Sequence, residues 1–231
     1  MSVERFRLNV RLELKTDLHI AGPGRTLPLV DRSVEVDETG MPFIPASSFR
    51  GRLRAHLERL LKAVGEKVCH APRPDSMCPH AGWPAFCRAC RIFGSPWRLS
   101  AVTFIPLTLA ESQRLSLEPL SFPLRTGVGI NRRLNTVEEQ RLFVLETVPQ
   151  EVKAHSLVFE GQIEGWLERE DIGWLIAGLR TLTHLGGGKG RGLGRVQIKR
   201  VELIFYDEST KQWQPQDWEA ILKEVKFGDS T

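Results

Sequence analysis

All four cysteines of the chain lie close together in the sequence, at Cys69, Cys78, Cys87 and Cys90. Cys87 and Cys90 form a C-x-x-C pair, which can bind one metal ion from a tight turn. The other two thiols can complete a tetrahedral site, and His70 or His80 could replace one of them. Because four thiolates leave no open coordination position, we expect a structural Zn²⁺ rather than a catalytic one.

The segment that carries these cysteines, residues 66–98, is irregular and rich in Pro, His and Trp. It has too few apolar residues to fold alone, so we predict a zinc-binding insertion. Four unconnected buried thiols are an alternative. A redox C-x-x-C would need a thioredoxin-like context, which is missing. A DNA-binding zinc ribbon ranks lowest, because its cations would be Arg73, Arg88 and Arg91 alone.

The hydrophobic pattern around the insertion predicts a mixture of strands and helices. Residues 6–14 alternate between apolar and polar and indicate a half-buried strand. Further strands are expected at 99–108, 141–148, 155–166 and 195–206. Ser47 or Ser48 can cap a first helix, which Gly65 can end. Its apolar face comprises Phe49, Leu53, Leu57, Leu60 and Leu61.

A second helix is expected at about 171–185 and a short amphipathic one near Trp218, while residues 119–135 resemble a loop. Two helices among antiparallel strands indicate an α+β protein with a ferredoxin-like or RRM-like core. We expect residues 1–231 to form a single domain.

The net charge of +4 is unevenly distributed. From Asp207 onward there are six acidic residues and three lysines, a balance of −3, so residues 1–206 carry +7. Clustered positive charge favours a polyanionic partner. The chain has no apolar run that could span a bilayer, and its N-terminus lacks the apolar block of a signal peptide. We therefore expect a cytoplasmic protein with no membrane partner.

A glycine-rich stretch, HLGGGKGRGLGRV, holds six glycines and three cations between His184 and Val196. A Walker A loop needs Ser or Thr after its Gly-Lys, but Gly190 follows Lys189. A dinucleotide loop opens a helix, whereas this stretch closes one and opens a strand. What remains is a backbone that can approach phosphates closely. The predicted nucleic-acid contacts are Gly187, Gly188, Lys189 and Arg191, and the alternative is a helix C-cap with a flexible turn.

Two further segments are candidates for contact with a nucleic acid. Ser47 and Ser48 lie where the first helix begins, a position that favours anions, and Arg50 and Arg54 share a face of that helix. The alternative is an exposed basic face balanced by Glu58. In the middle of the chain, Arg125 and Arg132 accompany Gly127 and Gly129; the alternative there is an exposed basic hairpin.

Three segments in order resemble the RAMP superfamily of CRISPR-associated proteins, and in particular its type III backbone subunits. They are "LHIAG…VDRSVEVDETGMPFIPASSFRGRLR", "RTGVGINRRLNTVEEQRLFVLETVP" and "GGGKGRGLGRV". Together they span nearly the whole chain. One departure is Ala46, which stands where the family's Pro-Gly-Ser-Ser turn has glycine. The resemblance implies a modified RRM-like core that stacks with other copies along a CRISPR RNA, and a thumb-like hairpin at about 119–140.

The resemblance also implies an activity. Asp31, in "LVDRSV", matches the aspartate with which type III backbone subunits cut target RNA, with Mg²⁺ or another divalent cation. Arg132 matches the family's Ile-(Asp/Asn)-Arg pattern. The implied partners are CRISPR RNA, complementary target RNA and further subunits of a prokaryotic effector complex. Two alternatives stay open: a scaffold without catalysis, and a guide-processing endoribonuclease using His19 or His184.

Overall fold

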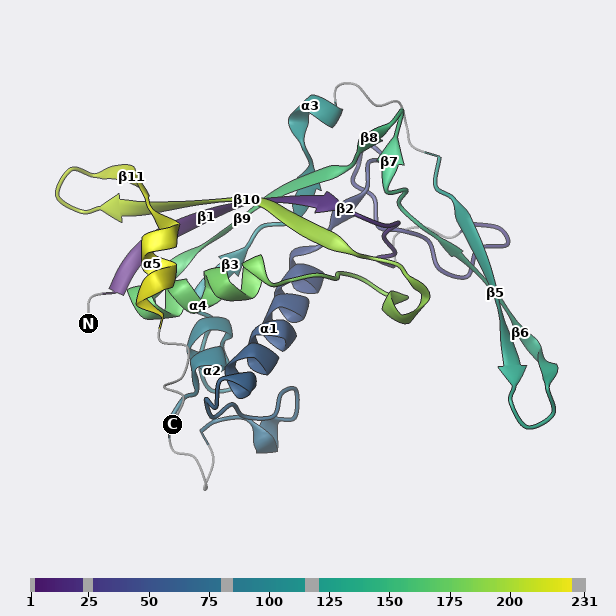
Figure 1. Ribbon diagram of the computed structural model, residues 1–231, viewed down its shortest axis with the longest axis horizontal. Coiled ribbons are helices and arrows are strands. Elements are labelled where there is room, and N and C mark those ends of the chain that lie inside the picture. Colours follow the sequence, from purple (N-terminus) through teal and green to yellow (C-terminus); the bar gives the residue numbers. More distant parts are fainter. Residues whose placement is uncertain (1–2, 23–26, 80–84, 115–120, 226–231) are drawn as a thin grey trace.

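The computed structural model describes residues 3–22, 27–79, 85–114 and 121–225. Its main sheet has seven strands, with β11, β10, β1, β9, β4 and β2 in that order and β3 paired with β9 (Figure 1). The strands are β1 (Val3–Leu14), β2 (Phe43–Ile44), β3 (Val102–Phe104), β4 (Leu107–Leu109), β9 (Val158–Glu168), β10 (Val196–Asp207) and β11 (Gln212–Gln216). All pairings are antiparallel.

The alternation in residues 6–14 explains why β1 is central. Its even-numbered side chains, from Phe6 to Leu14, are buried, and the odd-numbered ones between them lie on the opposite, outer face. β1 pairs with both β9 and β10, so its inner face contributes to the core along its whole length. The expected half-buried strand is confirmed, and it begins at Val3.

In the described part of the chain, five α-helices accompany the sheet: α1 (Ala46–Ala63), α2 (Arg88–Phe93), α3 (Glu111–Arg114), α4 (Arg169–Arg180) and α5 (Trp218–Glu224). α1 and α4 lie on one side of the sheet (Figure 1). The α1 face toward the core consists of Phe49, Leu53, Leu57 and Leu61, while Leu60 is only partly buried. Helices and an antiparallel sheet in one core confirm the α+β class.

Two helix boundaries differ from the prediction. The N-cap of α1 is Pro45, which has no capping side chain, so Ser47 and Ser48 lie inside the first turn and do not cap the helix. α4 ends at Arg180 rather than near Leu185. His184 instead pairs with Arg195 in an isolated antiparallel bridge, which a helical conformation would prevent.

Strands replace the loop that was expected at 119–135. β5 (Leu124–Asn131) and β6 (Thr136–Glu146) form a separate two-stranded hairpin that projects away from the sheet (Figure 1). Its alternation was hard to read because apolar residues are exposed along it, among them Val128, Ile130 and Leu142. The thumb-like segment therefore exists as a hairpin, although residues 119 and 120 fall outside the described part of the chain.

The remaining elements refine the predicted strands. The segment 99–108 is divided into β3 and β4 at Pro106, which cannot donate a ladder hydrogen bond. A short hairpin of β7 (Glu151–Val152) and β8 (His155–Ser156) precedes β9. Within the described ranges, no helix has the length and apolar character needed to cross a membrane.

Candidate functional site

Asp31 lies in the loop before β2 and is fixed to the base of the β5–β6 hairpin. Its carboxylate Oδ2 accepts a hydrogen bond from the Val144 N–H at 2.6 Å, and its own N–H donates to the Val144 carbonyl at 3.0 Å. The residue is exposed. Its second carboxylate oxygen has no hydrogen-bond partner in the ranges that the structure describes. Asp31 therefore presents one anchored and one accessible oxygen.

Buried hydrogen-bonding groups connect the loop that contains Asp31 to the glycine-rich loop. The carboxylate of Glu146 accepts a hydrogen bond from the Val34 N–H at 3.0 Å. The Glu146 carbonyl lies 2.7 Å from His19 Nδ1, and the His19 carbonyl accepts from the Gly187 N–H at 2.8 Å. Hydrogen bonds thus run from the Asp31 loop through β6 and the segment that follows β1 to the glycine-rich loop.

Sequence reasoning missed Glu146. The feature that could have identified it is a single acidic residue at the end of an apolar strand, "RLFVLE". The contacts of His19 are those of a structural residue: it is only 5% exposed, and both its ring and its carbonyl hydrogen-bond to the chain. Because a carbonyl can only accept, Nδ1 of His19 carries the proton. A histidine held in this way under a loop is poorly placed to meet an RNA phosphate, which weighs against the guide-processing alternative. His184 hydrogen-bonds its neighbour Thr183 and joins no triad within the described chain.

The glycine-rich loop is a closed loop whose neck is the His184–Arg195 bridge. Two of its glycines are needed for the fold itself. Gly186 has φ +71°, and a Cβ there would lie 2.3 Å from the His19 carbonyl oxygen. Gly194 has φ +74°, and a Cβ would lie 1.9 Å from the Leu185 carbonyl oxygen. Both positions exclude any side chain.

Gly190 is different, because the fold does not require it. Its φ is not in the left-handed region, and an added Cβ would meet nothing within 4 Å. It lies in the short exposed turn Lys189–Arg191, between two cations. A glycine that neither the backbone nor packing explains is suited to close approach by a ligand, here an anionic one.

A cavity of about 310 Å³ lies between this loop and the hairpin. Arg125, Gly127 and Arg191 are among its lining residues. Arg191 stacks over the Phe143 ring, with 4.9 Å from Cζ to the ring centroid, and Arg125 pairs with Asp17 at 2.7 Å. The predicted residues Arg125 and Arg191 are thus brought together. Arg132, in contrast, lies at the far tip of the hairpin, just after β5.

The arginines of α1 point in two directions. Arg50 donates to the Phe93 carbonyl, and Arg54 donates to Glu58 and to the Gly94 carbonyl, both at 2.8 Å. The Glu58 contact matches the alternative in which this face is balanced within the chain. Their i,i+4 spacing identified a shared face but not its direction. RNA contact by Arg50 and Arg54 stays a prediction, as it does for Ser47 and Ser48.

The arginine beside the glycine-rich loop is Arg52. Its Nε donates to the His184 carbonyl at 2.9 Å. Partial burial and the nearby charges of Arg52 and Arg59 lower the pKa of Lys189. Like charges gathered on one surface attract a polyanion. Sequence analysis placed Arg52 in the basic helix but did not select it as a contact.

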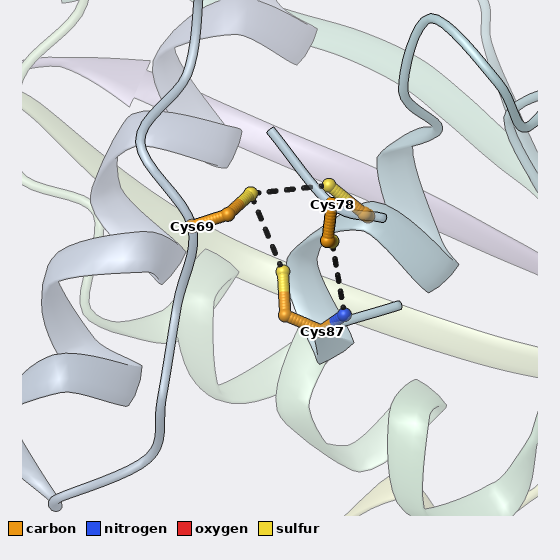
Figure 2. Close-up of side chains that lie close together, drawn as sticks. Cys69, Cys78 and Cys87 are labelled. Carbon is orange, nitrogen blue, oxygen red and sulfur yellow. Dashed lines mark hydrogen bonds between the residues drawn. The ribbon is translucent and has the colours of Figure 1, made fainter. Parts of the chain in front are cut away.

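The four cysteines converge as the spacing predicts. All are buried, and their sulfur atoms lie within 4.8 Å of one another. Figure 2 shows Cys69, Cys78 and Cys87 turned toward one another. The sulfur of Cys69 is 3.4 Å from that of Cys90 and 3.7 Å from that of Cys87. A tetrahedral Zn²⁺ with sulfur ligands at 2.3 Å needs sulfurs about 3.8 Å apart, so this group fits zinc.

Hydrogen bonding within the cluster favours a thiolate. A hydrogen bond from the Cys90 thiol lowers the pKa of Cys87 to about 4, and the same contact raises the pKa of Cys90. The Cys87 N–H donates to the sulfur of Cys78 at 3.2 Å. No histidine joins the group among the described residues: His70 is exposed, and His80 lies outside them.

The cysteine-bearing insertion is fastened to the core by ion pairs. Arg88 contacts Glu66 at 3.0 Å, Glu170 at 2.9 Å and Asp171 at 2.6 Å, and Arg91 contacts Asp171 at 2.9 Å. Both arginines are therefore neutralised within the chain, which leaves Arg73 alone of the three cations that a DNA-binding zinc ribbon would use.

Comparison with known proteins places this arrangement in context. The RAMP superfamily model matches residues 11–197, a range that includes Asp31, the cysteines, the hairpin and the glycine-rich loop. The chain is 25% identical over 227 residues to the CRISPR system Cms endoribonuclease Csm3 of Streptococcus thermophilus, covering 91% of this chain and 96% of that protein. It is 26% identical over 234 residues to the Csm3 endoribonuclease of Methanocaldococcus jannaschii, covering 93% and 89%.

Proposed function

This chain belongs to the RAMP superfamily, and from that premise we propose that it is an RNA-binding backbone subunit of a type III CRISPR effector that cleaves bound target RNA. The observation that carries the proposal is the position of Asp31. The 2.6 Å hydrogen bond from Val144 anchors an exposed carboxylate to the base of the hairpin. Hydrogen bonds through Glu146 and His19 link the same region to the glycine-rich loop.

The guide RNA is held by the surface around the glycine-rich loop. Arg52, Lys189 and Arg191 supply positive charge, and Gly190 lets a phosphate approach the backbone. Because guide bases must remain free to pair with the target, recognition is directed at phosphates and at backbone shape. Arg125 and Arg132 extend this surface along the hairpin, where the target strand would pass.

Cleavage is assigned to Asp31. RNA is cut when a 2′-hydroxyl attacks the adjacent phosphorus in line with the departing 5′-oxygen. The accessible oxygen of Asp31 is suited to accept the proton of that hydroxyl, while the anchored oxygen fixes the carboxylate. When bound, a divalent cation would neutralise charge on the phosphate. Such a cation would be held mainly by RNA oxygens and water, which leaves the accessible oxygen of Asp31 for the proton.

The four cysteines bind a structural Zn²⁺ that orders the insertion. All four ligands come from protein, so the metal has no open position for chemistry. The partners are a CRISPR RNA, its complementary target RNA, and further backbone subunits or copies of this chain. The setting is the prokaryotic cytoplasm.

The decisive experiment compares target cleavage by guide-loaded complexes that carry wild type, Asp31→Asn or Asp31→Ala. Asp31→Asn keeps an oxygen that accepts from Val144 but removes the charge, so it separates chemistry from loop anchoring. Both variants should lower the cleavage rate by at least about 100-fold, while target binding changes less than about twofold. Glu38→Gln, an exposed acid in the same segment, is the matched control.

Two outcomes oppose the proposal. If Asp31→Asn cuts at the wild-type rate, the catalytic assignment is wrong. If wild type binds target without cutting at any divalent-cation concentration, the chain is a scaffold that holds RNA without catalysis.

A further inference from the structure

An arginine–aromatic cluster occupies one end of the outer face of the main sheet, at the start of β1. The guanidinium carbon of Arg5 lies 5.4 Å from the ring centroid of Trp166, 4.9 Å from that of Tyr206 and 5.3 Å from that of Trp213. These residues come from β1, β9, β10 and β11, where strand pairing aligns Arg5 with Trp166 and Tyr206 with Trp213. The cluster is therefore built by the sheet itself and is held rigidly.

A cavity of about 490 Å³ opens beside this cluster. Its lining includes Arg5, Arg98, Trp166 and Trp213. Trp166 is 58% exposed, which is unusual for an indole that also packs against a guanidinium. The volume lies within the range of small-ligand sites and suits a unit the size of a nucleotide.

The cavity carries excess positive charge. Within the described residues, neither Arg5 nor Arg98 has a carboxylate partner. The acid in the lining, Glu164, is paired with Arg7 at 3.1 Å. The half-buried Arg5 and the exposed Arg98 thus lie beside an exposed indole, and no acid among the described lining residues is left to neutralise them.

Other arginines of the outer face differ from Arg5, because each has a carboxylate partner. Arg11 pairs with Glu160 at 2.5 Å, and Arg200 pairs with Glu202 at 2.6 Å. Excess charge and exposed aromatic surface therefore coincide at one end of the face, which points to an anionic ligand with a flat ring rather than to general solubility.

We infer that this cavity binds single-stranded RNA, with one base stacked on the free face of Trp166 and a neighbouring phosphate between Arg5 and Arg98. Exposed indoles stack on bases of any sequence, and arginine adds phosphate contact and cation–π attraction. Arg5 lies nine residues along β1 from Leu14, which pairs with Val196 just after the glycine-rich loop. At about 3.3 Å per residue this is roughly 30 Å, so the contact is separate from the guide surface.

The test measures binding of a fluorescein-labelled decauridine to the full-length chain by anisotropy. All variants are made in a protein that also carries Lys189→Ala and Arg191→Ala. These two substitutions weaken RNA binding by the glycine-rich loop and leave the cavity beside Trp166 intact. On that background Trp166→Ala should weaken binding about 5- to 100-fold. Arg98→Gln should reduce the magnitude of the slope of log affinity against log salt by about 0.7, the value for one phosphate contact on a single strand.

Trp97→Ala is the matched control, because Trp97 is 55% exposed and lies outside the lining of the cavity. Circular dichroism and thermal melting check that each variant is folded. The inference fails if Trp166→Ala binds decauridine as the background does, if Trp97→Ala causes the same loss, or if the background binds no decauridine. It also fails if Trp166→Ala changes the oligomeric state and not RNA affinity, which would make this face a protein contact. Guide binding by wild type is measured separately, so failure here leaves the proposed function standing.

Discussion

Arg54 Nη2 lies 3.5 Å from the sulfur of Cys90. The same guanidinium donates to the Gly94 carbonyl and to Glu58, each at 2.8 Å. These contacts, led by the hydrogen bond to Glu58, raise the pKa of Arg54 despite its partial burial. Four thiolates around Zn²⁺ leave a net charge of −2, and a fixed cation against one sulfur offsets part of it. Arg54 therefore connects α1 to the cysteine cluster in which we propose that zinc binds.

Arg54→Met should weaken metal binding by about 10- to 100-fold, the usual effect of removing a partner of a metal ligand. Competition with a chromophoric chelator measures this directly. Arg54→Lys keeps the positive charge but cannot contact Glu58, Gly94 and Cys90 at the same time, so its zinc affinity should lie between those of wild type and Arg54→Met. Arg59→Met, on the exposed part of the same helix, is the control. Equal zinc affinity in Arg54→Met and wild type would reduce Arg54 to a packing role.

Removal of the metal should destabilise the core as well as the insertion, because Phe93 follows the last cysteine and stacks on Phe104 at 6.1 Å between centroids. If zinc is held at about 1,000 times its Kd, chelation costs about 4 kcal/mol, which lowers Tm by about 8–16 °C for a chain of this size. Calorimetry with and without chelator measures the shift. Cys78→Ser should melt near the chelated protein, and Tm values unaffected by both would contradict a structural metal.

Two glycines of the same loop should respond in opposite ways to alanine. Gly194→Ala forces a Cβ against the Leu185 carbonyl at positive φ, so it should destabilise the fold by about 1–3 kcal/mol. Gly190→Ala meets open space, so stability should stay within about 0.5 kcal/mol. Guide-RNA affinity of Gly190→Ala should nevertheless fall several-fold. Denaturant titration and RNA-binding measurements on both variants separate the two effects, and unchanged RNA affinity in Gly190→Ala would remove this glycine from the RNA surface.

His56 should make folding sensitive to mild acid. Burial, and then the charges of Arg59 and Arg52, lower its pKa below the model-peptide value of 6.5. The unfolded chain therefore binds the proton more readily than the native one. Stability should be fully present above about pH 6.5 and should decline as pH falls from there through the native pKa. NMR titration locates the native midpoint, which Arg59→Ala should raise. His56→Gln should lose this part of the pH dependence, and a midpoint at or above 6.5 would refute the assignment.

The parts of the fold that sequence predicts well are those in which one periodicity dominates. The strict alternation in 6–14 identified the central strand, and the spacing of Phe49, Leu53, Leu57 and Leu61 identified the buried face of α1. The convergence of the cysteines also followed from their spacing alone. In each case burial of a regular set of side chains determines the local structure.

Other features depended on tertiary contacts that leave no local trace. Apolar residues remain exposed along β5 and β6, so burial does not mark that hairpin as strand. Arg50 and Arg54 share a face, but only the docking of residues 90–94 shows that this face is occupied. The role of Glu146 depends on Val34 and His19, more than 100 residues away in the chain. RNA contact stays a prediction for all of these arginines, and the structure adds Arg52, which donates to the His184 carbonyl beside the glycine-rich loop.

The position of β1 has a consequence for biosynthesis. Its first pairing partner, β9, begins at Val158, and its second, β10, ends at Asp207. The hydrogen bond between Arg7 and Glu164, for example, joins residues that are 157 positions apart in the chain. Such long loop closures make folding slow. On the ribosome, both the cysteine segment and the hairpin emerge before the sheet can close around its first strand. The thiols are therefore open to metal capture while the core is still unformed, and the cell's supply of zinc at that moment can influence how much nascent chain reaches the native state.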